Sequence, residues 1–222
     1  MRRRLVIVSG TGTGIGKTHV SQALLRALTP RWSRVTGIKP VETGLGQASA
    51  SDASLLDRAS SFHVQHSGFF FAEPISPHLA ARAAGRPIDV DAVVSEIDAI
   101  RATADVTLVE LPGGLFTPLT DTSVNAALAR ALAPDVMVLV APDRLGVLHD
   151  VIAVHRAADS VPLEIHVVAL VAPERADAST GRNADEIVRL LSPLMLARIA
   201  RADIDDLALA PDVLGIADLL AP

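Results

Sequence analysis

A glycine-rich segment and two lysines are the residues of this chain best suited to chemistry on phosphates. The segment follows an apolar run, precedes a helical pattern, and reads Gly10-Thr11-Gly12-Thr13-Gly14-Ile15-Gly16-Lys17-Thr18. Glycines let backbone N–H groups curl around phosphate oxygens, and the following helix adds the positive end of its dipole. We therefore predict a P-loop in which residues 12–18 bind a nucleotide, Lys17 reaches the β- and γ-phosphates, and Thr18 binds Mg²⁺.

The spacing of the glycines departs from the strict P-loop pattern and does not match the dinucleotide-binding pattern. Strict P-loop spacing asks for a glycine five positions before Gly16, where this chain has Thr11. A glycine-rich turn that binds no nucleotide is the alternative, but a glycine, a lysine and a threonine at the start of a helix favour a nucleotide. The dinucleotide pattern G-x-G-x-x-G would need its third glycine at Lys17, so a nicotinamide cofactor is not expected.

The second lysine stands out because lysine is so rare in this chain. Eighteen of the twenty basic residues are arginine, and the two lysines are Lys17 and Lys39. Lys39 begins the segment Lys39-Pro40-Val41-Glu42-Thr43-Gly44, directly after an apolar run. Loops at the carboxyl ends of parallel strands line the ligand crevice, so Lys39 is expected to face the P-loop and stabilise a transferring phosphoryl group. A surface lysine at a strand end is the alternative.

Two carboxylates are candidate magnesium ligands. Glu110 ends an apolar run just before Gly113-Gly114, and Asp52 lies in a polar stretch after Gly44. Mg²⁺ prefers hard oxygen ligands close to the phosphates that it accompanies. We predict that Thr18, Asp52 and Glu110 form the metal site, while a surface or helix-capping role is the alternative for Asp52.

Apolar runs alternate with helical patterns along most of the chain. The strand-like runs cover residues 5–9, 35–39, 106–110, 136–140 and 165–171, and the helical patterns cover residues 17–28, 90–101, 124–132, 147–158 and 183–191. This alternation is typical of βαβ units with a mostly parallel sheet. The sequence therefore predicts an α/β fold of the P-loop NTPase type, with helices on both faces of the sheet.

Residues 44–87 form the least regular part of the sequence. The stretch opens with polar residues at 47–52 and continues with three phenylalanines at 69–71 and prolines at 74 and 77. We expect loops and short helices over the catalytic edge rather than a separate domain. Residues 1–222 are therefore expected to form a single domain.

The composition limits the partners. The net charge of −5 argues against broad electrostatic binding to nucleic acid or to an anionic membrane, and the absence of cysteine excludes disulfides and thiolate chemistry. The apolar run at residues 5–8 is too short for a signal peptide, and no stretch approaches the ~20 apolar residues of a membrane span. We expect a soluble, cytoplasmic protein.

Several motifs together resemble those of the dethiobiotin synthetase family. They fall in the family's order and approximate spacing over residues 6–150, and they comprise residues 10–18, 39–44, 51–53, 71–78, 110 with 113–114, and 116–122. The stretch Pro74-Ile75-Ser76-Pro77-His78 is more specific to the family than any P-loop.

The resemblance implies a homodimeric enzyme of biotin biosynthesis that needs ATP and Mg²⁺. The family joins 7,8-diaminononanoate to CO₂ as a carbamate, phosphorylates the carbamate, and closes a ureido ring. By this resemblance Lys17, Thr13 and Lys39 are catalytic contacts of phosphate and carbamate. Thr43, Lys39 and Gly113 are implied to bind the substrate, and Thr18, Asp52 and Glu110 the metal.

The chain differs from the family pattern at three places. Glu110-Leu111-Pro112-Gly113-Gly114 replaces the usual Glu-Gly-Ala-Gly-Gly, and Pro112 removes a backbone donor. His149-Asp150 stand where the family has Asn-His, and residues 171–174 lack the asparagine that recognises the base. These differences leave open a diverged paralogue that uses another acceptor. A nucleotide-switch ATPase is the other alternative, although such proteins carry a lysine at the position of Gly12.

Overall fold

The computed structural model describes residues 3–45, 50–191 and 195–221. Within them, a six-stranded parallel sheet has the order β2-β5-β1-β6-β7-β8, and β3 and β4 form a separate parallel pair. The strands are β1 (Arg4–Gly10), β2 (Val35–Ile38), β3 (Val41–Thr43), β4 (Phe69–Phe71), β5 (Val106–Glu110), β6 (Val136–Pro142), β7 (Val167–Val171) and β8 (Met195–Ile199).

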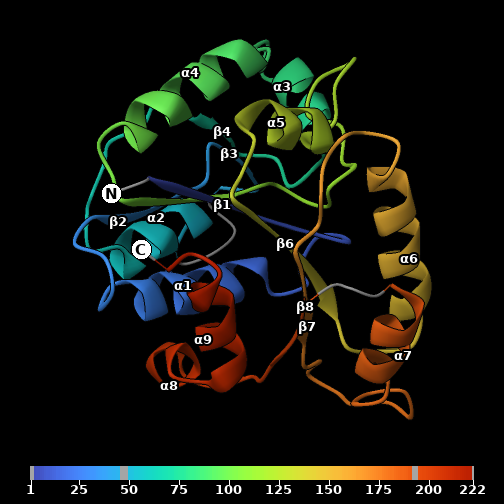
Figure 1. The fold of residues 1–222 in the computed structure, drawn as a ribbon. Coiled ribbons are helices and arrows are strands. Elements are labelled where there is room, and N and C mark those ends of the chain that lie inside the picture. Colours follow the sequence, from blue (N-terminus) through green and yellow to red (C-terminus); the bar gives the residue numbers. More distant parts are fainter. Residues whose placement is uncertain (1–2, 46–49, 192–194, 222) are drawn as a thin grey trace.

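Helices cover both faces of the main sheet (Figure 1). The helices are α1 (Lys17–Leu28), α2 (Asp52–Ala59), α3 (Pro77–Ala83), α4 (Val90–Arg101), α5 (Asn125–Leu132), α6 (Val147–Ala158), α7 (Asn183–Leu190), α8 (Ile204–Ala208) and α9 (Pro211–Asp218). Buried side chains of α1, α2, α8 and α9 share one hydrophobic cluster, and those of α3 to α7 share the other.

Alternation along the strands divides side chains between these two clusters. In β1, Leu5 and Ile7 belong to the cluster under α4 and α5, whereas Val6 and Val8 belong to the cluster under α1. Successive side chains of a strand point to opposite faces, so a continuous apolar run is what a strand covered on both sides requires. The predicted α/β fold with two covered faces is confirmed.

All ten strands and helices that we expected form, and their ends differ from the expected ones by at most two residues. The expected helices at 17–28, 90–101 and 147–158 have the bounds of α1, α4 and α6. The expected strand at 165–171 begins later, at Val167, because Ile165 and His166 precede the regular ladder with β6.

Some elements were not foreseen. We did not predict β3, β4 or β8, nor the helices α8 and α9 near the carboxyl end. Within the irregular stretch from residue 44 to residue 87, where we expected loops and short helices, the structure forms the short helices α2 and α3, together with β4. Gln47, Ala48 and Ser49, which we expected in its polar opening, lie outside the described residues. Across the described ranges, no helix has both the length and the apolar character needed to cross a membrane.

Candidate nucleotide and metal site

The predicted P-loop connects β1 to α1 at the carboxyl edge of the main sheet. β1 ends at Gly10 and α1 begins at Lys17. Gly14 and Gly16 have φ angles of 69° and 92°, in the left-handed region that side chains disfavour. A Cβ on Gly16 would also lie 3.0 Å from the Val171 side chain. The loop therefore needs glycine at these two positions for its backbone path.

Lys17 lies folded against this loop. Its side chain is buried, and its Nζ donates a hydrogen bond of 2.9 Å to the carbonyl oxygen of Gly12. The pKa of Lys17 is lowered from 10.5 to about 8, chiefly by burial; the charge of Glu110 opposes this shift, the charge of Lys39 adds to it, and the charge of Asp52 opposes it. A buried ammonium whose hydrogen-bond partner among the described residues is a carbonyl can exchange that partner for a phosphate oxygen.

Glu110 is the centre of a polar network at the end of β5. Its carboxylate is fully buried (0% exposed) and accepts hydrogen bonds from three side chains. The Thr18 hydroxyl (2.9 Å) and Lys39 Nζ (2.8 Å) both donate to Oε1, and the Ser21 hydroxyl (2.8 Å) donates to Oε2. The network thus joins α1, the residue after β2, and β5 at one carboxylate.

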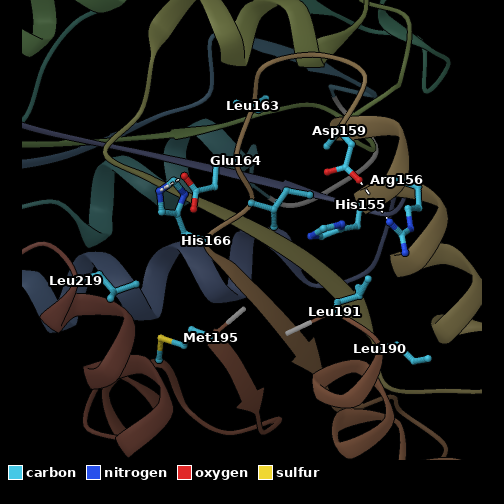
Figure 2. A pocket seen from close by; sticks show the side chains of 12 residues that line it. His155, Arg156, Asp159, Leu163, Glu164, His166, Leu190, Leu191, Met195 and Leu219 are labelled. Carbon is cyan, nitrogen blue, oxygen red and sulfur yellow. Dashed lines mark ion pairs between the residues drawn. The ribbon is translucent and has the colours of Figure 1, made fainter. Parts of the chain in front are cut away.

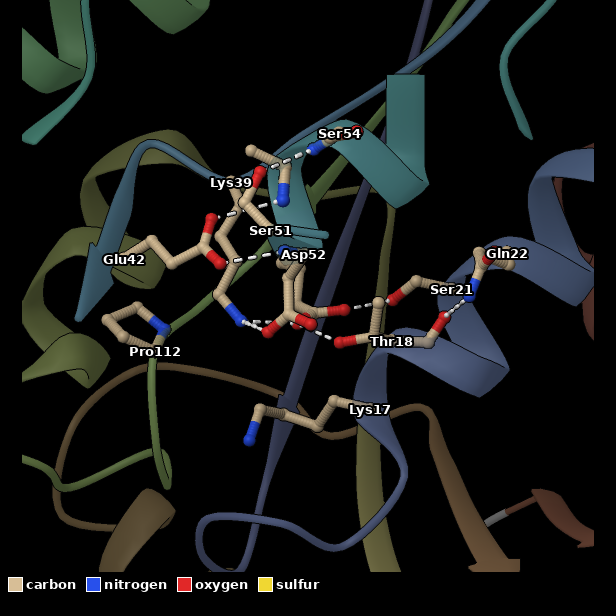
Figure 3. A network of polar contacts seen from close by, with 12 residues as sticks. Lys17, Thr18, Ser21, Gln22, Lys39, Glu42, Ser51, Asp52, Ser54 and Pro112 are labelled. Carbon is tan, nitrogen blue, oxygen red and sulfur yellow. Dashed lines mark hydrogen bonds and ion pairs between the residues drawn. The ribbon is translucent and has the colours of Figure 1, made fainter. Parts of the chain in front are cut away.

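Lys39 links this carboxylate to Asp52 (Figure 3). Its ammonium donates to Glu110 and to Asp52 Oδ2, and its side chain is only 7% exposed. Burial alone would lower the pKa of Lys39, but the charges of Glu110 and Asp52 outweigh it and raise the pKa above its ordinary value. Lys39 is therefore a charged, buried residue rather than a surface lysine at a strand end.

Asp52 reaches the network from the first position of α2. The Ser51 side chain caps this helix by accepting from the backbone N–H of Ser54 at 3.1 Å. Glu42 of β3 accepts from the backbone N–H groups of Asp52 (2.7 Å) and Ala53 (3.1 Å). The start of α2 is thus held from two sides (Figure 3).

The loop after β5 lies directly against the P-loop. The backbone N–H of Leu115 donates to the carbonyl of Gly10 at 2.9 Å, and a Cβ on Gly114 would lie 3.1 Å from the same oxygen. Asn125, buried at the start of α5, donates to the carbonyls of Pro112 (2.5 Å) and Gly114 (2.9 Å). Gly113, an expected substrate contact, is therefore held between two anchored carbonyls.

These parts enclose one cavity of about 690 Å³. Every residue that we predicted for the site lines it except Gly12, whose carbonyl instead holds Lys17. The predicted lining residues are Thr13, Gly14, Ile15, Gly16, Lys17, Thr18, Lys39, Thr43, Asp52, Glu110 and Gly113.

The oxygen atoms around Lys39 suit a magnesium ion. Thr18 contributes a hydroxyl, and Glu110 and Asp52 contribute carboxylates that already share one cation, the Lys39 ammonium. Among the described side chains, no group of three or more His, Cys, Asp or Glu residues could hold a metal by itself. Such a donor set fits an ion that also takes phosphate oxygens and water as ligands, as Mg²⁺ usually does.

A second cavity, of about 510 Å³, lies between the end of α6 and the strands β7 and β8 (Figure 2). Its polar side chains mix both signs of charge and include His155, Arg156, Asp159, Glu164 and His166. It shares no residue with the P-loop cavity. The predicted site residues therefore lie apart from this second cavity.

Three positioning contacts were missed from the sequence. Ser21 binds Glu110, Glu42 binds the start of α2, and Asn125 binds the loop at Pro112. The spacing of Ser21 three residues after Thr18 puts both on one helical face, which was a usable signal. Glu42 and Asn125 act on backbone groups that only the folded chain brings near them.

Proteins with similar sequences are dethiobiotin synthetases. A family model described as an AAA domain matches residues 4–204. The ATP-dependent dethiobiotin synthetase of Anaeromyxobacter dehalogenans is 37% identical over 213 residues, which cover 90% of this chain and 95% of that protein. The enzyme of the same name from Nitrosospira multiformis is 36% identical over 76% of each chain.

Solved structures with the same fold are more distant. A ParA family ATPase from Chlorobium tepidum superposes with a TM-score of 0.59 at 15% identity, covering 98% of this chain and 97% of that one. The septum site-determining protein MinD of Pyrococcus horikoshii gives 0.57 at 17% identity, covering 99% and 95%. These structures share the fold alone, whereas the sequence relatives identify the family. The chain belongs to the dethiobiotin synthetase family.

Proposed function

We propose that this chain is an ATP-dependent dethiobiotin synthetase, a ligase that forms carbon–nitrogen bonds in biotin biosynthesis. The observation that carries the proposal is the single cavity in which the P-loop, Lys39 and two carboxylates meet. The names of the sequence relatives support the same activity.

The proposed substrates are 7,8-diaminononanoate, CO₂ and ATP. One amine of the diamine and CO₂ form a carbamate, and a carbamate oxygen attacks the γ-phosphorus while ADP leaves. The second amine then attacks the carbonyl carbon, phosphate leaves, and the ureido ring closes. Because the substrate supplies both nucleophiles, the protein needs only to position groups and neutralise charge.

The residues of the cavity divide this work. The P-loop amides, Thr13 and Lys17 would bind the phosphates, while Lys39 would stabilise charge on the carbamate and the transferring phosphoryl group. Thr43 and Gly113 would contact the diamine. Bound Mg²⁺ supplies neutralisation of the phosphate oxygens, and Thr18, Asp52 and Glu110 would hold it.

We further propose that the enzyme works as a homodimer in the cytoplasm, where ATP is made and consumed. Size-exclusion chromatography with multi-angle light scattering tests the dimer: a single species at twice the mass of one chain is expected at micromolar concentration. A monomer at that concentration would contradict it.

The experiment that tests the function is phosphate release from ATP with diaminononanoate and bicarbonate, each omitted in turn. We expect release to require both and to match dethiobiotin formation measured by mass spectrometry. Release with another diamine but not with diaminononanoate would indicate a diverged paralogue. Hydrolysis without any diamine, together with nucleotide-dependent dimerisation, would indicate a switch ATPase.

A further inference from the structure

The structure assigns to Glu42 the role of a positioning residue, which places Asp52 for the metal by binding the backbone at the start of α2. The inference rests on the proposed function only in taking Asp52 as a ligand of the magnesium that accompanies the nucleotide. Glu42 lies within the segment from Lys39 to Gly44, where neither the sequence motifs nor the reaction gave it a task.

The geometry accounts for both oxygens of the Glu42 carboxylate. Oε1 accepts from the N–H of Asp52 at 2.7 Å, and Oε2 accepts from the N–H of Ala53 at 3.1 Å. Glu42 is only 6% exposed. The two N–H groups and the positive end of the α2 dipole stabilise this buried charge.

Glu42 and Ser51 together complete the first turn of α2. The first three N–H groups of a helix lack partners within the helix, and here Glu42 takes the first two and Ser51 takes the third, that of Ser54. The same backbone position that Glu42 holds carries the Asp52 side chain to Lys39. Glu42 therefore acts on the metal site through the backbone of Asp52.

The body of α2 does not depend on Glu42. Leu56 and Ala59 are buried in the cluster shared with α1, and α2 packs against α1 and β2. Loss of the Glu42 contacts should therefore loosen the first turn while the rest of the helix stays docked. The expected defect is a misplaced Asp52 carboxylate in a folded protein.

The test measures how much Mg²⁺ strengthens binding of a non-hydrolysable ATP analogue. For each variant, calorimetry gives the dissociation constant in EDTA and in saturating Mg²⁺, and their ratio is the gain due to the metal. Glu42→Gln loses a charge and one acceptor, and we expect it to reduce this gain about tenfold, with little change in EDTA. A gain within twofold of wild type would overturn the proposal.

Two further variants separate position from charge and from stability. Glu42→Asp keeps the charge but is too short to reach both N–H groups, so it should lose the gain as Glu42→Gln does; full rescue by Glu42→Asp would mean that only the charge matters. It also serves if Glu42→Gln fails to fold. Asp89→Ala removes the side chain that caps α4, where it accepts from Ala92 at 3.0 Å. This control should lower the melting temperature and leave the gain unchanged.

A double-mutant cycle decides whether Glu42 acts through Asp52. In an Asp52→Asn background, Glu42→Gln should cause no further loss of the gain, because the ligand that it positions is already removed. If the double variant instead loses the gain by the product of the two single losses, Glu42 acts independently of Asp52. If Asp52→Asn alone keeps the wild-type gain, Asp52 is not a ligand of the metal and Glu42 has no ligand to position. Either result overturns the proposal. No diamine is used, so failure of the proposed function, seen as absent diamine-dependent phosphate release, is a separate outcome.

Discussion

At the scale of single residues, the two lysines of the chain have opposite electrostatic surroundings. Lys17 has a carbonyl as its hydrogen-bond partner and a lowered pKa, whereas Lys39 lies between two carboxylates and has a raised one. Burial therefore disfavours the charged form of Lys17 when no ligand is bound. The charged form of Lys39 is stabilised by Glu110 and Asp52, which are themselves expected to bind the metal. Each lysine yields a prediction.

Lys17→Met should stabilise the ligand-free protein while abolishing phosphoryl transfer. The pKa of Lys17 falls from 10.5 to about 8 on folding, so below pH 8 the folded state carries the full cost of a buried charge. This cost shrinks as the pH rises from 8 to 10.5. After allowing for the lost hydrogen bond to Gly12, we expect a gain of about 2 kcal/mol at pH 7 and a smaller one at pH 9.5, measured by urea unfolding. Equal stability at pH 7, or more than a tenth of wild-type turnover, would contradict it.

Lys39→Arg should separate nucleotide binding from ring closure. The planar guanidinium is larger than the ammonium that fits between Glu110 and Asp52, so it must displace the charge or the carboxylates. A shift of about 1 Å in such a site can cost roughly a hundredfold in rate. We expect ATP affinity within a few-fold of wild type and loss of most dethiobiotin formation. Normal turnover would show that the lysine at this position is not required.

At the scale of elements, the site depends on how loops are anchored between strands and helices. The loop after β5 contains Pro112, which has no N–H to donate. Asn125 of α5 holds this loop by donating hydrogen bonds to the carbonyls of Pro112 and Gly114. This anchor also keeps the loop against the P-loop, where Leu115 binds the carbonyl of Gly10.

Asn125→Ala should loosen this loop. Two buried carbonyls lose their donor, which we expect to cost about 1–3 kcal/mol of stability. Because the freed loop carries Gly113, the KM for the diamine should rise more than the dissociation constant of ATP. Steady-state kinetics and calorimetry measure the two quantities. The capping variant Asp89→Ala is the stability control, and an unchanged KM in Asn125→Ala would remove this loop from the substrate site.

At the scale of the whole molecule, one sheet joins two hydrophobic clusters, and the ends of the described chain meet. Arg4 Nη2 donates to the carbonyl of Ala221 at 3.0 Å, which ties the first strand to the residues after α9 (Figure 1). A sheet shared by both clusters makes separate unfolding of either face costly. We propose that residues 1–222 form a single domain.

This proposal predicts one cooperative unfolding transition. The single tryptophan, Trp32, is buried in the cluster on the α1 face, so its fluorescence reports on that face, while far-UV circular dichroism reports on all helices. The two signals should give the same urea midpoint. Two different midpoints would indicate two independently unfolding units.

Binding of a nucleotide should raise this stability. An ATP analogue with Mg²⁺ at a hundred times its dissociation constant should stabilise the protein by about 2.7 kcal/mol in the same urea titration.

The local motifs of the site and the main elements could be predicted from the sequence. Local patterns of a few residues predict these features. Apolar runs mark the buried strands that Lys39 follows and Glu110 ends, glycines mark the left-handed turn of the P-loop, and the helical pattern after it gives the bounds of α1. The order of the strands did not follow, because it depends on pairings between distant segments. The pairing of β3 with β4 did not follow either, because runs of three residues have no period to read.

Only the tertiary structure decided which partners hold the site in place. Ser21 and Glu110 are 89 residues apart and Lys39 and Glu110 are 71 apart, yet each pair shares a hydrogen bond. The roles of Glu42 and Asn125 depend on backbone N–H and carbonyl groups, which residues of almost every type carry and which therefore leave no mark in the sequence. The sequence by itself determined the residue types that the chemistry needs. The fold decided their protonation and position, because burial and neighbouring charges exist only once distant segments have packed together.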